Sequence, residues 1–213
     1  MARAEKNRES IPTLSKGALS ILEVAERLFA DKGFDAVSIK EIAQQAGTSK
    51  ANVFHHFKSK EGLYLAVLKM ACSRSAEALH AAKRRTPDNA VDQMSNFFTC
   101  HLKSLLEQPR SARLIQRELM ENGEKRGKRV AREVFAETFS KLVNLVREAQ
   151  AQGMVRSEID ASLLAFLLVG ANVVFFETRS VLKHLPEIDF AESPDHYSSA
   201  VFALLSRGFA KMA

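Results

Sequence analysis

Residues Ser38 to Phe57 have the sequence SIKEIAQQAGTSKANVFHHF, and this stretch decides the fold of the whole N-terminal region. Ser38 followed by Glu41 forms a capping box, a pattern with which many helices begin. Gly47 stands where a tight turn needs a positive φ angle, and Thr48 or Ser49 can cap a second helix. The stretch therefore predicts two short helices joined by a turn.

Three residues fix the angle between these two predicted helices. Ala43 has little bulk where the helices cross closely, Gly47 permits the turn, and Val53 fills the angle between them. This spacing is typical of a helix-turn-helix motif, whose second helix presents its first turn to the major groove of DNA. That first turn holds Lys50, Ala51 and Asn52. The alternative interpretation is a small helical hairpin with no role in DNA binding.

The composition is that of a soluble globular protein with a modest excess of positive charge. The chain has 213 residues, of which 46% are hydrophobic, enough for one large domain or two small ones. A formal net charge of +6 and a pI of about 9.4 favour a partner such as nucleic acid, although many unrelated proteins share this balance. Cys72 and Cys100 form no CxxC pair, so we expect a reducing cytoplasm, no disulfide framework and no zinc site.

No targeting or membrane segment is expected. The first ten residues, MARAEKNRES, lack the apolar region of a secretory signal, and we expect residues 1–14 to form a flexible, weakly basic arm. The most apolar stretch, Leu163 to Phe176, is expected to be too short to span a bilayer, which needs roughly 20 residues of helix.

Apolar residues at helical spacing predict an all-α fold, because no stretch alternates as a strand does. The first helix ends near Lys32 before Gly33, and a connecting helix over residues 61–86, capped by Ser59, runs to about Ala82 before the boundary at Lys83 to Pro87. Later helices are expected through Met94 and Leu105; from Pro109 until Gly123 and Gly127 interrupt it; through Phe135 to Gly153; from Asp160 to Leu185; and from Pro194 to Lys211.

Residues Ile21 to Leu65, ILEVAERLFADKGFDAVSIKEIAQQAGTSKANVFHHFKSKEGLYL, strongly resemble the N-terminal domain of the TetR family of bacterial transcriptional regulators. The resemblance is ungapped and includes the KGF, EIA and HFKSKE segments. It implies an Ω-shaped, all-helical homodimer with a three-helix DNA-binding domain over residues 15–60. A larger domain over residues 87–213 would bind an effector and the second subunit. The implied partner is a partly palindromic double-stranded DNA operator.

The resemblance also implies roles for single residues. Ser38, His55, His56 and Lys60 would contact phosphates, while Lys50, Ala51 and Asn52 would face base edges, with Ser49 beside them at the helix start. Lysine can donate to guanine and asparagine can pair with adenine, which suits Lys50 and Asn52 to this task. Phe54 stands where many members have tyrosine, so we expect it to lose a phosphate contact and to serve packing only.

Candidate effector contacts are Phe98, His101, Phe139 and Asn172. A buried polar group without a partner costs on the order of 1 to 3 kcal/mol, so His101 and Asn172 each need one. That partner is a bound ligand, a backbone carbonyl or the other subunit. The basic run from Lys125 to Arg132 is interpreted as a solvated helix face.

Two hypotheses follow for function. The first is a dimeric repressor that a small, mostly apolar effector releases from its operator, with dimer contacts mainly in residues 160–185 and 194–211. The alternative is a DNA-binding protein whose C-terminal half binds a protein partner, in a structural or cell-cycle role without an effector. No GxSxG, HExxH or Walker-type stretch indicates an enzyme, and no cofactor or metal is expected. Either protein would work in the cytoplasm at the nucleoid.

Overall fold

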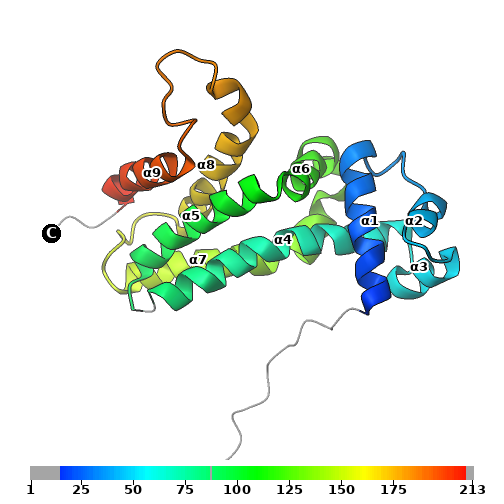
Figure 1. The fold of residues 1–213 in the computed structure, drawn as a ribbon. Helices are drawn as coiled ribbons and strands as arrows, with labels where there is room; N and C mark the ends of the chain where they lie inside the picture. Colours follow the sequence, from blue (N-terminus) through cyan, green and yellow to red (C-terminus); the bar gives the residue numbers. More distant parts are fainter. Residues whose placement is uncertain (1–14, 87, 210–213) are drawn as a thin grey trace, which may run out of the picture. The chain divides into compact units, whose positions relative to one another are not determined.

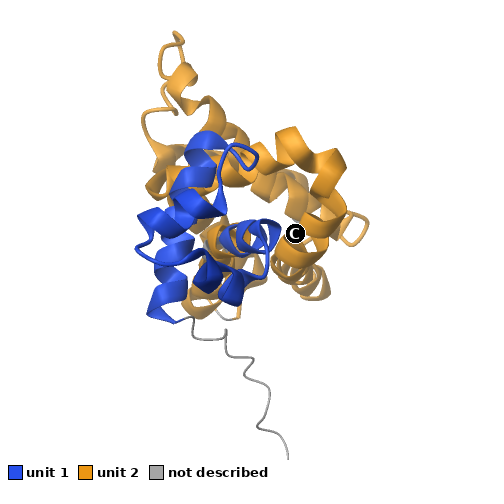
Figure 2. Cartoon of the chain, turned by 90° about the vertical axis from the view of Figure 1, so that its right-hand side faces the viewer, with its two compact units in different colours: residues 1–67 blue, residues 68–213 orange. Residues whose placement is uncertain are grey.

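The N-terminal part of the chain forms a compact helical unit. The computed structural model describes residues 15–86 and 88–209, so the arm predicted for residues 1–14 lies outside the described residues. The chain divides into two compact units, residues 1–67 and 68–213 (Figure 2). The first unit contains α1 (Lys16–Lys32), α2 (Ile39–Gln45), α3 (Lys50–Phe57) and the start of α4 (Lys60–Arg85) (Figure 1).

Serine side chains cap the starts of these helices. The hydroxyl oxygens of Ser15, Ser38, Ser49 and Ser59 each accept a hydrogen bond from the backbone N–H three residues later, at 2.9 to 3.2 Å. Each bond satisfies a donor that the first turn of a helix leaves without an internal partner. The predicted helix starts at Ser38, Ser49 and Ser59 are therefore confirmed.

Two glycines end helices in the conformation that the sequence predicts. Gly33 has a φ of 81° after α1, and Gly47 has a φ of 64° in the turn between α2 and α3. Most other residues avoid this region because the Cβ atom collides with the backbone. The turn closes through a hydrogen bond of 2.9 Å from the Thr48 N–H to the Ala43 carbonyl.

The core of the N-terminal unit forms on the predicted face of α1. The α1 side chains that are at most 5% exposed are Ala18, Ile21, Leu22, Ala25, Leu28 and Phe29. Ala43 and Val53 are also buried, at 3% and 1% exposed, which confirms their predicted place inside the motif. Tyr64 of α4 meets the Phe29 ring edge-on at 5.0 Å between centroids, so α4 completes this core.

The second unit is a helical bundle around one apolar core. Its helices are α5 (Ala90–Glu107), α6 (Pro109–Val130), η1 (Ala131–Phe135), α7 (Ala136–Ala151), α8 (Ala161–Leu182) and α9 (Pro194–Phe209), together with the rest of α4. Helix α5 packs against α7, α8 and α9, and α7 also packs against α8. Asp160 caps α8, and Gly153 follows α7 with a φ of 71°, both as predicted.

Some predicted boundaries differ from the structure. Helix α8 ends at Leu182 rather than Leu185, and residues 210 and 211 of the predicted last helix lie outside the described residues. Helix α4 runs to Arg85, so the basic residues that begin the expected boundary at Lys83 are its last turn and belong to the second unit.

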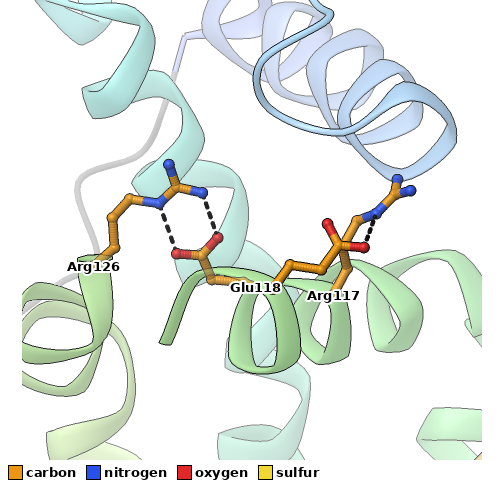
Figure 3. A network of polar contacts seen from close by, with 4 residues as sticks. Arg117, Glu118 and Arg126 are labelled. Carbon is orange, nitrogen blue, oxygen red and sulfur yellow. Dashed lines mark hydrogen bonds and ion pairs between the residues drawn. The ribbon is translucent and has the colours of Figure 1, made fainter. Parts of the chain in front are cut away.

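The predicted interruption of α6 at Gly123 and Gly127 is wrong. The helix continues through both glycines to Val130, and the irregular part follows as the π-helical segment η1. A glycine inside a helix costs only about 1 kcal/mol, which other contacts can offset. One such contact spans Gly123: the Arg126 guanidinium donates to both Glu118 carboxylate oxygens, at 2.8 and 2.7 Å (Figure 3).

The apolar stretch from Leu163 to Phe176 lies within the longer apolar helix α8. The 22 residues of α8 are long and apolar enough to cross a membrane by length and composition only, and 33% of its most apolar window is buried. The core helix of a soluble protein passes the same test. On one side α8 contributes Leu164, Leu168 and Phe175 to the core. On the other side, the apolar residues that are exposed in the single chain are Leu163, Phe166, Leu167, Val174 and Val181.

We predict that Gly62→Ala destabilises the N-terminal unit. A Cβ atom at Gly62 would overlap the carbonyl oxygen of Phe57, so the first turn of α4 would have to move away from the end of α3. Such overpacking costs about 1 to 3 kcal/mol, which calorimetry would record as a lower melting temperature.

The matched control is Gly123→Ala in α6, where a Cβ atom meets nothing within 4 Å. That substitution should raise stability by up to about 1 kcal/mol, because alanine favours a helix more than glycine does. Equal effects of the two substitutions would contradict the role given to Gly62.

Candidate DNA-binding site

Helix α3 exposes one face and buries the other. Val53 and Phe57 point into the core at 1% and 9% exposed. Successive residues of a helix are about 100° apart, so the direction opposite these two side chains falls on His55 and close to Ala51. Phe54 lies on one flank of that direction, and Asn52 and His56 lie on the other. Lys50 is only about 40° from the buried direction but is exposed at the first position of the helix.

His55 therefore lies at the centre of the exposed face, whereas a residue that contacts phosphates is expected on a flank. The sequence predicts phosphate contacts for both histidines, but only His56 occupies a flank, where it is half-buried. The two rings meet edge-on at 5.3 Å between centroids. This arrangement favours a base contact for His55 and a groove-wall contact for His56.

Asn52 is engaged within its own motif. Its Nδ2 donates to Thr48 Oγ1 at 2.8 Å, and the side chain is half-buried. Pairing with adenine uses both the oxygen and the nitrogen of the amide, so Asn52 would have to release Thr48 in order to read a base as predicted. In the free chain its side chain fixes the turn before α3.

Lys60 is also engaged. Its Nζ donates to the Asp35 carbonyl at 3.2 Å and lies 4.5 Å from the centroid of the Phe34 ring. These contacts bind the start of α4 to the link between α1 and α2, so Lys60 positions the motif as well as presenting charge. An ammonium group has three donors, which leaves capacity for the predicted phosphate contact.

Ser38 and Ser49 are both accessible at helix starts. Each hydroxyl accepts a backbone N–H, from Glu41 and Asn52 respectively, and each residue is exposed. A hydroxyl that accepts one hydrogen bond can still donate its own proton to a phosphate oxygen. Their capping role is confirmed, and their DNA contact stays a prediction.

The prediction that Phe54 serves packing only is wrong. Its side chain is 44% exposed on the flank of α3, because Val53 and Phe57 already fill the contact between α3 and the core. An aromatic ring therefore lies uncovered on the recognition helix, one turn after Lys50.

The candidate effector residues are brought together only in part. Asn172 Nδ2 donates to the Phe98 carbonyl at 2.8 Å and to His101 Nδ1 at 3.3 Å. Of the three partners predicted for Asn172, the structure thus shows the backbone carbonyl. Burial lowers the pKa of His101 to about 4, which keeps the imidazole neutral as an acceptor at Nδ1. Phe139 lies apart, 37% exposed, because the buried face of α7 begins at Leu142.

The basic run from Lys125 to Arg132 is mostly a solvated helix face, as predicted. Lys125, Lys128 and Arg132 are exposed, but Arg126 is an exception: its side chain is 15% exposed and binds Glu118, which is 2% exposed. Among the residues that the structure describes, no three His, Cys, Asp or Glu side chains gather to hold a metal ion.

Sequence reasoning missed four contributors to the site. They are Thr48 as the partner of Asn52, Phe34 as the partner of Lys60, Tyr64 in the core and Gly62 beside Phe57. Gly62 carried a usable signal, since a glycine in the first turn of a helix is unfavourable unless close packing requires it. The Phe34 and Tyr64 contacts join separate elements, whereas Thr48 lies only four residues before Asn52.

The capped helix pair, the glycine turn and the exposed polar face of α3 define a helix-turn-helix DNA-binding regulator. Comparison with known families agrees: residues 21–67 match bacterial regulatory proteins of the tetR family, and residues 75–201 match the tetracyclin repressor-like C-terminal domain. The chain belongs to the TetR family of transcriptional regulators, whose members are DNA-binding proteins rather than enzymes.

Several curated relatives match only part of the chain. The transcriptional activator FasR of Mycolicibacterium smegmatis is 41% identical over 69 residues, 32% of each chain. The repressor AcnR of Corynebacterium diphtheriae is 35% identical over 74 residues, 32% of this chain and 39% of the relative. The chain thus spans about a third of the length of these relatives. The repressor KstR2 of M. smegmatis is 26% identical over 153 residues, 68% of this chain and 70% of that one.

Solved structures share the whole fold at low identity. A TetR family regulator from Marinobacter aquaeolei VT8 superposes with a TM-score of 0.71 at 20% identity, covering 92% of this chain and 96% of that one. The ketosteroid regulator KstR2 of Mycobacterium tuberculosis gives a TM-score of 0.63 at 17% identity, covering 93% and 97%. These likenesses extend the all-helical TetR-like fold over both units.

We predict different losses for Lys60→Ala and Asn52→Ala. Removing the Lys60 charge should weaken binding to all DNA sequences alike and lower the slope of log affinity against log salt by about one, because one phosphate contact is lost. Removing the Asn52 amide should relax preference at one base position. Binding assays on an operator and its single-base variants at several salt concentrations measure both effects.

Lys103→Ala, which removes an exposed lysine of the second unit, is the matched control and should leave the salt slope unchanged. If Lys60→Ala and Asn52→Ala behave identically across sequences, the roles assigned to them are wrong.

Proposed function

We propose that this chain is a homodimeric repressor that holds an operator with two α3 helices and leaves it when a small, mostly apolar effector binds the second unit. The observation that carries the proposal is the uncovered apolar side of α8, which would hold two subunits together. A dimer is needed because one recognition helix contacts too few base pairs to select a site. Two helices spaced one DNA turn, about 34 Å, apart read both halves of a palindrome. We place this activity in the cytoplasm, at the nucleoid.

The uncovered side of α8 has the pattern of a helix interface. Its exposed apolar residues recur at helical spacing, and each is 43% to 63% exposed: Leu163, Phe166, Leu167, Val174 and Val181. Leu204 of α9 is 67% exposed. Contiguous apolar surface of this kind marks association sites in soluble proteins. A second copy of α8 and α9 supplies a complementary surface by two-fold symmetry.

A buried acceptor in the second unit supports an effector. Asn172 Oδ1 is fully buried and has no hydrogen-bond partner within the described part of the chain. A ligand donor that reached it would remove a cost of about 1 to 3 kcal/mol. Asn172 binds the Phe98 carbonyl, and the Phe97 ring stacks on its partner His101, so the effector would be mostly apolar with one donor group.

Repression and release require the effector to prefer a conformer that does not fit DNA. Helix α4 begins in the first unit and ends in the second, so it is the element that we expect to carry the change. AcnR and KstR2 are named repressors, which supports repression, whereas FasR is named an activator.

One observation favours the alternative, a DNA-binding protein whose second unit binds a protein. An apolar pocket beside Glu118 and Phe135 has a volume of about 80 Å³, and an open groove beside Cys100 and Lys103 has about 560 Å³. Neither hollow is lined by His101 or Asn172. The first is smaller than the roughly 300 Å³ of a typical ligand site. An effector that bound Asn172 would therefore have to open the core around it.

We predict that Val174→Glu produces a monomer. This monomer no longer binds the palindromic operator in the DNA upstream of the gene that encodes the protein. A carboxylate in the centre of the α8 stripe would be desolvated without a partner in the dimer. Light scattering measures the mass, and gel shift at moderate salt measures binding. Met120→Glu is the control, because Met120 is 80% exposed on α6, and it should stay dimeric and bind.

We also predict that an apolar compound with one hydrogen-bond donor raises the melting temperature of the wild type and releases its DNA. Asn172→Leu, which lacks the acceptor, should bind that compound about tenfold more weakly, the value of one hydrogen bond. A protein that copurifies with the chain and binds its second unit, with no compound releasing DNA, would support the alternative instead.

A further inference from the structure

The exposed ring of Phe54 is the one apolar group on the outward face of α3 that is larger than a methyl. The neighbouring exposed residues of α3 are Lys50, Ala51 and His55. Only one other large apolar side chain among residues 15–67 is as exposed, Leu19 of α1 at 42%. Exposed apolar area costs about 25 cal/mol for each Å², so covering the Phe54 ring in a complex is favourable.

The position of the ring on α3 limits what can cover it. Phe54 lies about 80° around the helix from the buried direction that Val53 and Phe57 define, and it is one turn beyond Lys50. When the first turn of α3 faces the groove floor, a residue on this flank faces the edge of the bases and the adjoining groove wall. A phenyl ring has no group that hydrogen-bonds to a phosphate or to a polar base edge.

Thymine is the base that matches this chemistry. It alone presents an apolar group in the major groove, the C5-methyl, and apolar side chains including phenylalanine contact it there. We propose that Phe54 selects a thymine in each operator half-site by packing its ring on the C5-methyl group. This inference rests on the proposed operator binding of the α3 helices and adds a base preference to it.

Deoxyuridine tests the contact, because it differs from thymidine only by the missing C5-methyl group. The operator is first located by footprinting on the upstream DNA, and its thymines are then replaced one at a time. For the wild type, replacement of one particular thymine in either half-site should lower the affinity about fourfold, which corresponds to one buried methyl group. In Phe54→Ala the same substitution should have no effect, because the ring is absent.

Two further variants control the result. Leu19→Ala removes an equally exposed apolar side chain of the same unit and should keep the wild-type response to deoxyuridine. Phe54→Tyr keeps the ring and should keep the fourfold response, while its hydroxyl raises affinity for all sequences alike. Melting temperatures equal to the wild type establish that each variant is folded. If Phe54→Ala is not folded, Phe54→Ser, which also lacks the ring, takes its place and should likewise show no response to deoxyuridine.

The outcomes separate the inference from the function that it depends on. If no upstream DNA is bound specifically, the proposed repressor function fails. If an operator is bound but the wild type and Phe54→Ala respond equally to every deoxyuridine, the proposed methyl contact is wrong. Loss of the response in Phe54→Ala alone, at a thymine in each half-site, supports the inference.

Discussion

Helix α3 has eight residues, and a helix that short does not persist alone in water. Its geometry depends on what surrounds it. Ser49 caps its start, Val53 and Phe57 are buried beneath it, and Gly62 lets the first turn of α4 approach its last carbonyl groups. The orientation of the recognition face is thus fixed by packing within the N-terminal unit, before any DNA is present.

The same constraint explains why polar groups of the site are already bonded. The Asn52 amide holds Thr48, and the Lys60 ammonium holds the Asp35 carbonyl. These bonds order side chains that would otherwise lose conformational freedom on binding, which lowers the entropic cost of association. Reading a base with Asn52 would exchange a bond inside the motif for a bond to DNA. A ring such as Phe54 needs no exchange, since it only loses contact with water.

The sequence predicted those parts of the fold that local chemistry decides. Serines at helix starts, positive φ at Gly47 and the apolar face of α1 follow from residues within a few positions of one another, and the structure confirms them. The continuity of α6 through Gly123 was not predictable in this way. It involves an ion pair eight residues apart, Glu118 with Arg126, whose burial depends on packing from the rest of the unit.

The second unit keeps polar groups where apolar ones would cost less. Asn172 and His101 are 0% and 4% exposed, and the lowered pKa of His101 reflects the same burial. Replacing both partners of such a neutral hydrogen-bonded pair with apolar groups of the same shape can be nearly neutral or stabilising. The pair supports the proposed effector site, and α8, which carries Asn172 on its covered side, carries the uncovered apolar stripe on the other. A change at Asn172 would thus reach the proposed dimer contact through a single helix.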